Sequence, residues 1–109
     1  MISENEIDRV LSYLRDNAEK DAHARAERLY LEQWLKTILA QEQSKINASS
    51  VAAAEMGARI SQPYIAALSA YKEAIYEDER RRFLRAAAEA KIEAWRTQSS
   101  NERAQGKIG

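Results

Sequence analysis

The segment Gly57-Ala58-Arg59-Ile60-Ser61-Gln62-Pro63 decides the fold of this chain, because outside the C-terminal tail it is the only cluster of helix-breaking residues. It holds the single proline and one of the three glycines. A long run of helix-forming residues precedes the cluster and another follows it. The sequence therefore predicts an all-α fold, a long helical hairpin with a short middle helix.

Local signals give the expected bounds of the helices. Ser3 and Glu6 form a capping box, and an apolar stripe at helical spacing follows it, made of Ile7, Val10, Leu11 and Leu14. Ser50 suits the cap of the short helix, which Gly57 and the segment up to Pro63 should end. Pro63 suits the first turn of the third helix, where its missing N–H has no helical partner. We expect helices over 4–46, 51–58 and 63–99, a frayed tail over 100–109, and a single helical domain over 1–109.

Bulk properties favour a protein that associates with copies of itself. Each long helix would span about 60 Å, and a lone hairpin that thin has almost no interior. We therefore expect a helical homo-oligomer. Lys plus Arg equals Asp plus Glu, 17 each, so net charge gives no general attraction to nucleic acid or membrane, although a local basic patch is still compatible. The absence of cysteine excludes disulfides and thiolate chemistry.

The sequence also argues against a membrane protein and an enzyme. The acidic N-terminus lacks the apolar core of a signal peptide, and no apolar run approaches the roughly 18 residues that span a bilayer, so we expect a cytoplasmic protein. His23 is the only histidine, and a solvated position on a polar helix face is favoured over a general base or zinc ligand. There is no glycine-rich phosphate loop. We expect no catalysis, cofactor, metal or small-molecule substrate.

The densest charge feature is Glu77-Asp78-Glu79-Arg80-Arg81-Arg82, which interrupts the apolar stripe of the third helix. One interpretation is a solvated face that neutralises itself through i, i+4 pairs of acid before base. The other is a ridge of arginines that contacts phosphates, because guanidinium forks suit phosphate oxygens. This ridge would contain Arg80, Arg81, Arg82 and Arg85. Arg80, Arg81 and Arg82 are expected to lie outside the apolar stripe.

A second candidate surface combines basic residues with an indole. It contains Lys91, Trp95, Arg96 and Arg103. Single-strand binders stack bases on aromatic faces and hold the backbone with arginine. However, Trp95 also continues the apolar stripe, and Trp34 lies in the stripe of the first helix. Packing in the core is the favoured interpretation for both tryptophans, and stacking on a base is the alternative for Trp95.

Two stretches resemble small helical proteins from the replication and recombination regions of tailed phages. They are Ala26-Glu27-Arg28-Leu29-Tyr30-Leu31-Glu32-Gln33-Trp34-Leu35-Lys36 and Ala90-Lys91-Ile92-Glu93-Ala94-Trp95-Arg96 with Ser99-Ser100-Asn101-Glu102-Arg103. The arrangement is similar to the UvsY-type recombination mediators. That resemblance implies a helical oligomer in the host cytoplasm, with single-stranded DNA and a RecA-like recombinase as partners. The matching basic positions are Lys36, Lys45, Lys91 and Arg96.

Three functions remain open from the sequence. The first is a recombination mediator that holds single-stranded DNA on repeated basic and aromatic surfaces. The second is a protein–protein adaptor, or an inhibitor of a host factor, with the same fold and no affinity for DNA. The third is a component of virion assembly. A basic face would distinguish the first function from the others.

Overall fold

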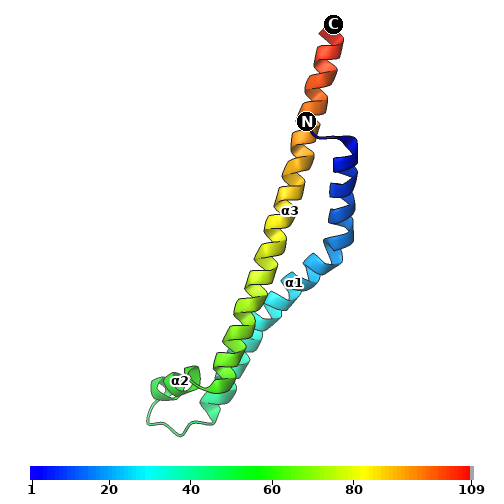
Figure 1. Cartoon of the computed structure of the whole chain (residues 1–109). Coiled ribbons are helices and arrows are strands. Elements are labelled where there is room, and N and C mark those ends of the chain that lie inside the picture. Colours follow the sequence, from blue (N-terminus) through cyan, green and yellow to red (C-terminus); the bar gives the residue numbers. More distant parts are fainter. Residues whose placement is uncertain (109) are drawn as a thin grey trace. The chain divides into compact units, whose positions relative to one another are not determined.

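The structure is a computed structural model that describes residues 1–108, with side chains as far as Gly106. It contains three helices (Figure 1): α1 (Glu4–Ser44, 41 residues), α2 (Val51–Arg59, 9 residues) and α3 (Gln62–Ile108, 47 residues). The described residues form no strand. The prediction of an all-α helical hairpin with a short middle helix is confirmed.

Side-chain caps begin the first two helices. The hydroxyl of Ser3 accepts a hydrogen bond from the backbone N–H of Glu6 at 3.2 Å. Ser50 has extended backbone angles and accepts from the N–H of Ala53 at 3.1 Å. Each serine thus satisfies one of the N–H groups that lack a partner in the first turn of a helix.

The break between α2 and α3 lies within the segment 59–62 that the sequence predicts, but it is shorter, since only residues 60–61 separate the helices. Gly57 does not end α2, because the helix runs through it to Arg59 and none of the glycines that the structure describes has a positive φ. Ile60 is the C-cap, and the next residue, Ser61, donates from both its backbone N–H and its hydroxyl to the carbonyl of Ala58. The carbonyl of Ser61 then accepts from the N–H of Ile65, which begins the hydrogen bonding of α3.

The predicted frayed tail over 100–109 is helical as far as the structure describes it. α3 continues from Ser99 to Ile108, and Gly109 lies outside the described residues. The segment contains no proline, and one glycine in a helix interior costs only about 1 kcal/mol relative to alanine. Lack of apolar periodicity was therefore the wrong criterion for the end of this helix.

The chain divides into two compact units, where the sequence predicts one domain over 1–109. One unit consists of Met1–Asp21 with Arg80–Gly109, and the other of Ala22–Glu79. In each unit a segment of α1 pairs with a segment of α3. The large apolar residues of α1 explain the division, because they form two groups, within 7–14 and 29–39, separated by small and charged residues.

The paired surfaces follow a heptad. Buried and half-buried residues alternate in steps of three and four, which is the spacing of a coiled-coil seam. In the first unit they are Ile7, Val10, Leu14, Asn17 and Asp21 of α1, with Arg81, Arg85, Ala88, Ile92 and Trp95 of α3; in the second they are Ala24, Arg28, Leu31, Leu35 and Ile38, with Tyr64, Ala67, Tyr71, Ala74 and Asp78. We call these positions the seam.

Contacts in the first unit show that the two helices are antiparallel there. Ile2 exchanges two hydrogen bonds with the side chain of Gln98, and Lys91 Nζ lies 3.4 Å from Glu6 Oε2. Further along α1, Asp21 meets residues at the start of the α3 segment. Residue numbers therefore rise along α1 as they fall along α3.

The seam buries small apolar side chains and only two large ones. Three of its five buried apolar residues are alanines, Ala24, Ala67 and Ala74, and the other two are Ile7 and Tyr64. No large side chain is completely buried in the part of the chain that the structure describes. Close approach of the helices therefore leaves much of the large apolar surface on the outside.

Two glycine substitutions test the stability of the last turns of α3, at Gly106, and the packing of α2, at Gly57. A β-carbon at Gly106 would meet no atom within 4 Å, so Gly106→Ala should strengthen the last turns of α3, because alanine is favoured over glycine in helices by up to about 1 kcal/mol. At Gly57 the β-carbon would lie 2.8 Å from Ile46 Cδ1, the end of a flexible side chain. Gly57→Ala should therefore change the free energy of unfolding by between zero and about +0.5 kcal/mol.

Thermal unfolding followed by circular dichroism measures the effect at Gly57, and amide hydrogen exchange measures that at Gly106. A loss of more than about 1 kcal/mol in Gly57→Ala would mean that Ile46 is held too tightly to move.

Candidate functional site

In the first unit the seam is charged at the end that contains Asp21. The carboxylate of Asp21 receives two guanidinium groups: Arg81 Nη1 lies 3.4 Å from Oδ1 and Arg85 Nη1 lies 3.3 Å from Oδ2. The side chain of Asp21 is only 10% exposed and that of Arg81 18%. Both oxygens of a nearly buried carboxylate are thus matched by cations, which offsets the cost of taking these charges out of water.

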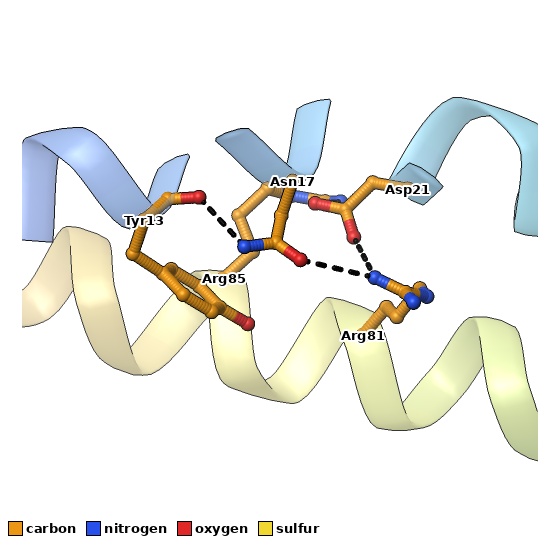
Figure 2. A network of polar contacts seen from close by, with 5 residues as sticks. All are labelled: Tyr13, Asn17, Asp21, Arg81 and Arg85. Carbon is orange, nitrogen blue, oxygen red and sulfur yellow. Dashed lines mark hydrogen bonds and ion pairs between the residues drawn. The ribbon is translucent and has the colours of Figure 1, made fainter. Parts of the chain in front are cut away.

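Asn17 extends this cluster toward the N-terminus of α1 (Figure 2). Its amide oxygen accepts from Arg81 Nη1 at 3.4 Å, and its amide nitrogen donates to the backbone carbonyl of Tyr13 at 2.9 Å. The helix backbone therefore orients Asn17 with its oxygen toward the arginine. We call Asn17, Asp21, Arg81 and Arg85 the first polar layer.

A second polar layer lies in the other unit and has the opposite arrangement of charge. Here the cation, Arg28, comes from α1, and the acids, Asp78 and Glu79, come from α3. Arg28 Nη1 donates to Glu79 Oε1 at 2.7 Å and to Asp78 Oδ2 at 3.2 Å, and Asp78 is buried. The hydrogen bond to Glu79 is the main cause that raises the pKa of Arg28 above its ordinary value, and Asp78 adds to it. Arg28 therefore stays charged wherever the protein is folded.

The predicted arginine ridge is divided by these layers. Arg81 and Arg85 lie in the seam against Asp21, so the expectation that Arg80, Arg81 and Arg82 all lie outside the packed face is wrong for Arg81. The heptad that contains Ala74 and Asp78 continues through Arg81 and Arg85, which places their side chains toward α1. Arg80 and Arg82 are exposed, and both have interactions of their own.

Most of the other predicted cationic residues are held by acids. Lys91 pairs with Glu6 at 3.4 Å, Arg96 with Glu93 at 2.9 Å, and Lys45 with Glu42 at 2.6 Å. Lys36 is exposed on α1. Such exposed pairs are weak and exchange readily with other partners, but each acid lowers the positive potential that a phosphate would meet.

The predicted surface around Trp95 is partly assembled. A hollow of about 730 Å³ lies on α3 and is lined by Trp95, Arg96, Ser99, Ser100, Glu102 and Arg103. The indole is half-buried, whereas Arg96 and Arg103 are exposed. Lys91, the remaining member of the predicted set, does not line the hollow. An indole edged by two guanidinium groups is suited to a planar anionic ligand, although Glu102 opposes it.

Trp34 is not a core residue in this chain. It is 38% exposed and stacks on Tyr30, with ring centroids 6.4 Å apart and planes inclined by 8°. The prediction of core packing is wrong because Trp34 precedes the seam residue Leu35 and lies to one side of the contact with α3. The sequence pattern showed an apolar stripe, but that stripe is wider than the seam.

His23 is exposed. The described residues contain no group of three or more His, Asp or Glu side chains placed to hold a metal ion. Among the same residues, no helix has a segment that is both long and apolar enough to cross a bilayer.

The residues that sequence reasoning missed are Asn17, Asp21 and Arg28. A signal for two of them was present in the sequence, because Asp21 and Arg28 are seven residues apart, as are Asp78 and Arg85. Seven residues is one heptad, so both members of each pair share a helix face with the seam.

No protein-family model, curated protein or solved structure matches this chain.

The first polar layer should be essential to folding. Asp21→Ala removes the shared partner of two arginines in a nearly buried position, so we expect a loss of about 2–4 kcal/mol in the free energy of unfolding. Asp16→Ala is the matched control. Its carboxylate is 64% exposed and pairs only with the neighbouring Arg15, so the change should stay within about 0.5 kcal/mol.

Urea unfolding of both variants measures the difference. Equal losses at Asp21 and Asp16 would contradict the structural role of this layer.

Proposed function

We propose that this chain is a non-catalytic, cytoplasmic assembly protein that acts as a helical homo-oligomer. The observation that carries the proposal is its exposed area, 8098 Å² for 12.4 kDa. A compact folded monomer of that mass exposes about 6,100 Å². The difference of about 2,000 Å² exceeds the roughly 800 Å² that each partner contributes to a standard protein–protein interface.

The composition of the exposed surface supports association rather than mere elongation. Large apolar side chains remain at least one-third exposed on both long helices. On α1 they are Leu11, Leu29, Tyr30 and Trp34; on α3 they are Ile65, Leu68, Tyr76, Phe83 and Leu84. Single exposed apolar residues are normal, whereas neighbouring exposed ones, as in each of the two units, favour coverage by a partner. A homo-oligomer is the simplest partner because it needs no other gene product.

Light scattering coupled to size exclusion tests the proposal. We expect a mass that is a multiple of 12.4 kDa at micromolar concentration, since burial of these side chains drives association. A cooperatively folded, fully helical monomer at tens of micromolar would contradict it. An adaptor for another protein would then be the better interpretation of the same exposed surface.

A second candidate function is the recombination mediator, and the hollow beside Trp95 favours it. The indole and the guanidinium groups of Arg96 and Arg103 line one surface, which is the combination that single-strand binders use. The resemblance to UvsY-type mediators points to the same ligand, with a RecA-like recombinase as the second partner. Repetition of this hollow around an oligomer would raise the overall avidity for a strand that contacts several copies at once.

Tryptophan fluorescence tests this second function. In a Trp34→Phe background Trp95 is the sole indole, and stacking on a base should quench its emission when single-stranded DNA is added. Arg103→Ala should reduce the affinity and lower the salt slope by about 0.7, the value for one phosphate contact on a single strand. Arg15→Ala, an exposed arginine of α1, is the control and should change neither. Unchanged emission at low salt would exclude stacking at Trp95.

A further inference from the structure

α3 carries a second apolar stripe beside the seam. Ile65, Leu68, Lys72 and Ile75 each follow a seam residue by one position and repeat its spacing of three and four. Successive helix residues are rotated by about 100°, so this stripe lies about a quarter-turn around α3 from the seam. We call it the outer face of α3.

The outer face is hollowed and uncovered. Ile65, Leu68, Ser69, Tyr71, Lys72 and Ile75 line a hollow of about 530 Å³, all on α3 within the unit Ala22–Glu79. Ile65 is 45% exposed and Leu68 46%, whereas the seam residues Tyr64 and Ala67 are each 8% exposed. α1 therefore covers the seam stripe, whereas Ile65, Leu68 and Lys72 of the second stripe are exposed and Ile75 is half-buried.

A helix with two adjacent apolar stripes is built for two neighbours, as in a helical bundle. Within this chain α3 pairs with α1 through the seam and through ion pairs at its margins, Glu6 with Lys91 and Arg28 with Glu79. Lys72 is compatible with a covered stripe, because its aliphatic stem can lie along apolar surface while its ammonium group stays at the rim. On these grounds, and resting on the oligomer proposed above, we infer that the outer face of α3 docks against a second copy of this chain.

Two observations select a second copy as the occupant. The whole chain exposes about 2,000 Å² more than a compact monomer of its mass, and the outer face is an apolar, hollowed part of that exposed surface. In addition, the chain has equal numbers of basic and acidic residues, so two copies meet without net repulsion. A symmetric contact would bring the same apolar stripe from both copies, so that each face supplies the cover that the other lacks.

Cysteine crosslinking locates the interface directly, because the chain has no cysteine of its own. A single Leu68→Cys on the outer face should give a covalent dimer with a short bis-maleimide. Ala66→Cys is the matched control: it is exposed on the same turn, yet lies roughly 160° around the helix from Leu68. We expect efficient dimer formation at position 68 and little at position 66.

A disruptive variant gives the second measurement. Leu68→Glu should weaken association by about 100-fold or more, because it would place a charge in an apolar interface. Circular dichroism should show a lower helix content only at concentrations where the variant has dissociated, because this side chain is already half-exposed in the hairpin and affects folding through association alone. Ala66→Glu should alter neither property. Analytical ultracentrifugation over a dilution series measures the association constant of all three proteins.

The outcomes separate this inference from the function on which it rests. The inference that the outer face is the interface would be wrong if Leu68→Glu left the mass of the oligomer unchanged. It would also be wrong if positions 66 and 68 crosslinked equally. Either result would leave the proposed homo-oligomer unaffected. Crosslinking through Leu29→Cys instead would move the interface to α1. A monomeric wild type would overturn both.

Discussion

The pairing of α1 with α3 depends on the ion pairs within the seam. On each helix an aspartate precedes an arginine by one heptad: Asp21 and Arg28 on α1, Asp78 and Arg85 on α3. Antiparallel pairing sets acid against base in both polar layers, as observed. Parallel pairing would set acid against acid and base against base. Apolar contacts alone discriminate poorly between registers, so these charges help to specify the alignment.

Much of the secondary structure could be predicted because its causes are local. The caps at Ser3 and Ser50 act within three residues, and Pro63 restricts only its own turn. The helix ends that differ from prediction had misleading local signals. Gly57 is tolerated inside α2 because a single glycine lowers the stability of a helix without ending it. The residues after Ser99 are compatible with a helix and continue α3.

The site was harder to predict because it depends on residues far apart in the chain. Arg81 carried the same local signal as its neighbours, a cation among i, i+4 acids, and that signal describes an exposed arginine equally well. Its contact with Asp21 joins residues 60 positions apart, and only the heptad register reveals it. The prediction that Trp34 packs in the core was wrong for a related reason. Apolar periodicity shows that a side chain lies on one side of a helix, but it does not show which of two adjacent stripes a partner covers.

In the proposed oligomer, the thin seam would also make the amount of this protein a determinant of its structure. The seam completely buries no large side chain, so it supplies only part of the apolar burial that offsets the loss of chain entropy on folding. Contacts between copies would supply the remainder, and the folded fraction would rise with concentration by mass action. Dilution and heat would then act on the same equilibrium, and the cell could adjust the pool of folded protein through synthesis and proteolysis alone.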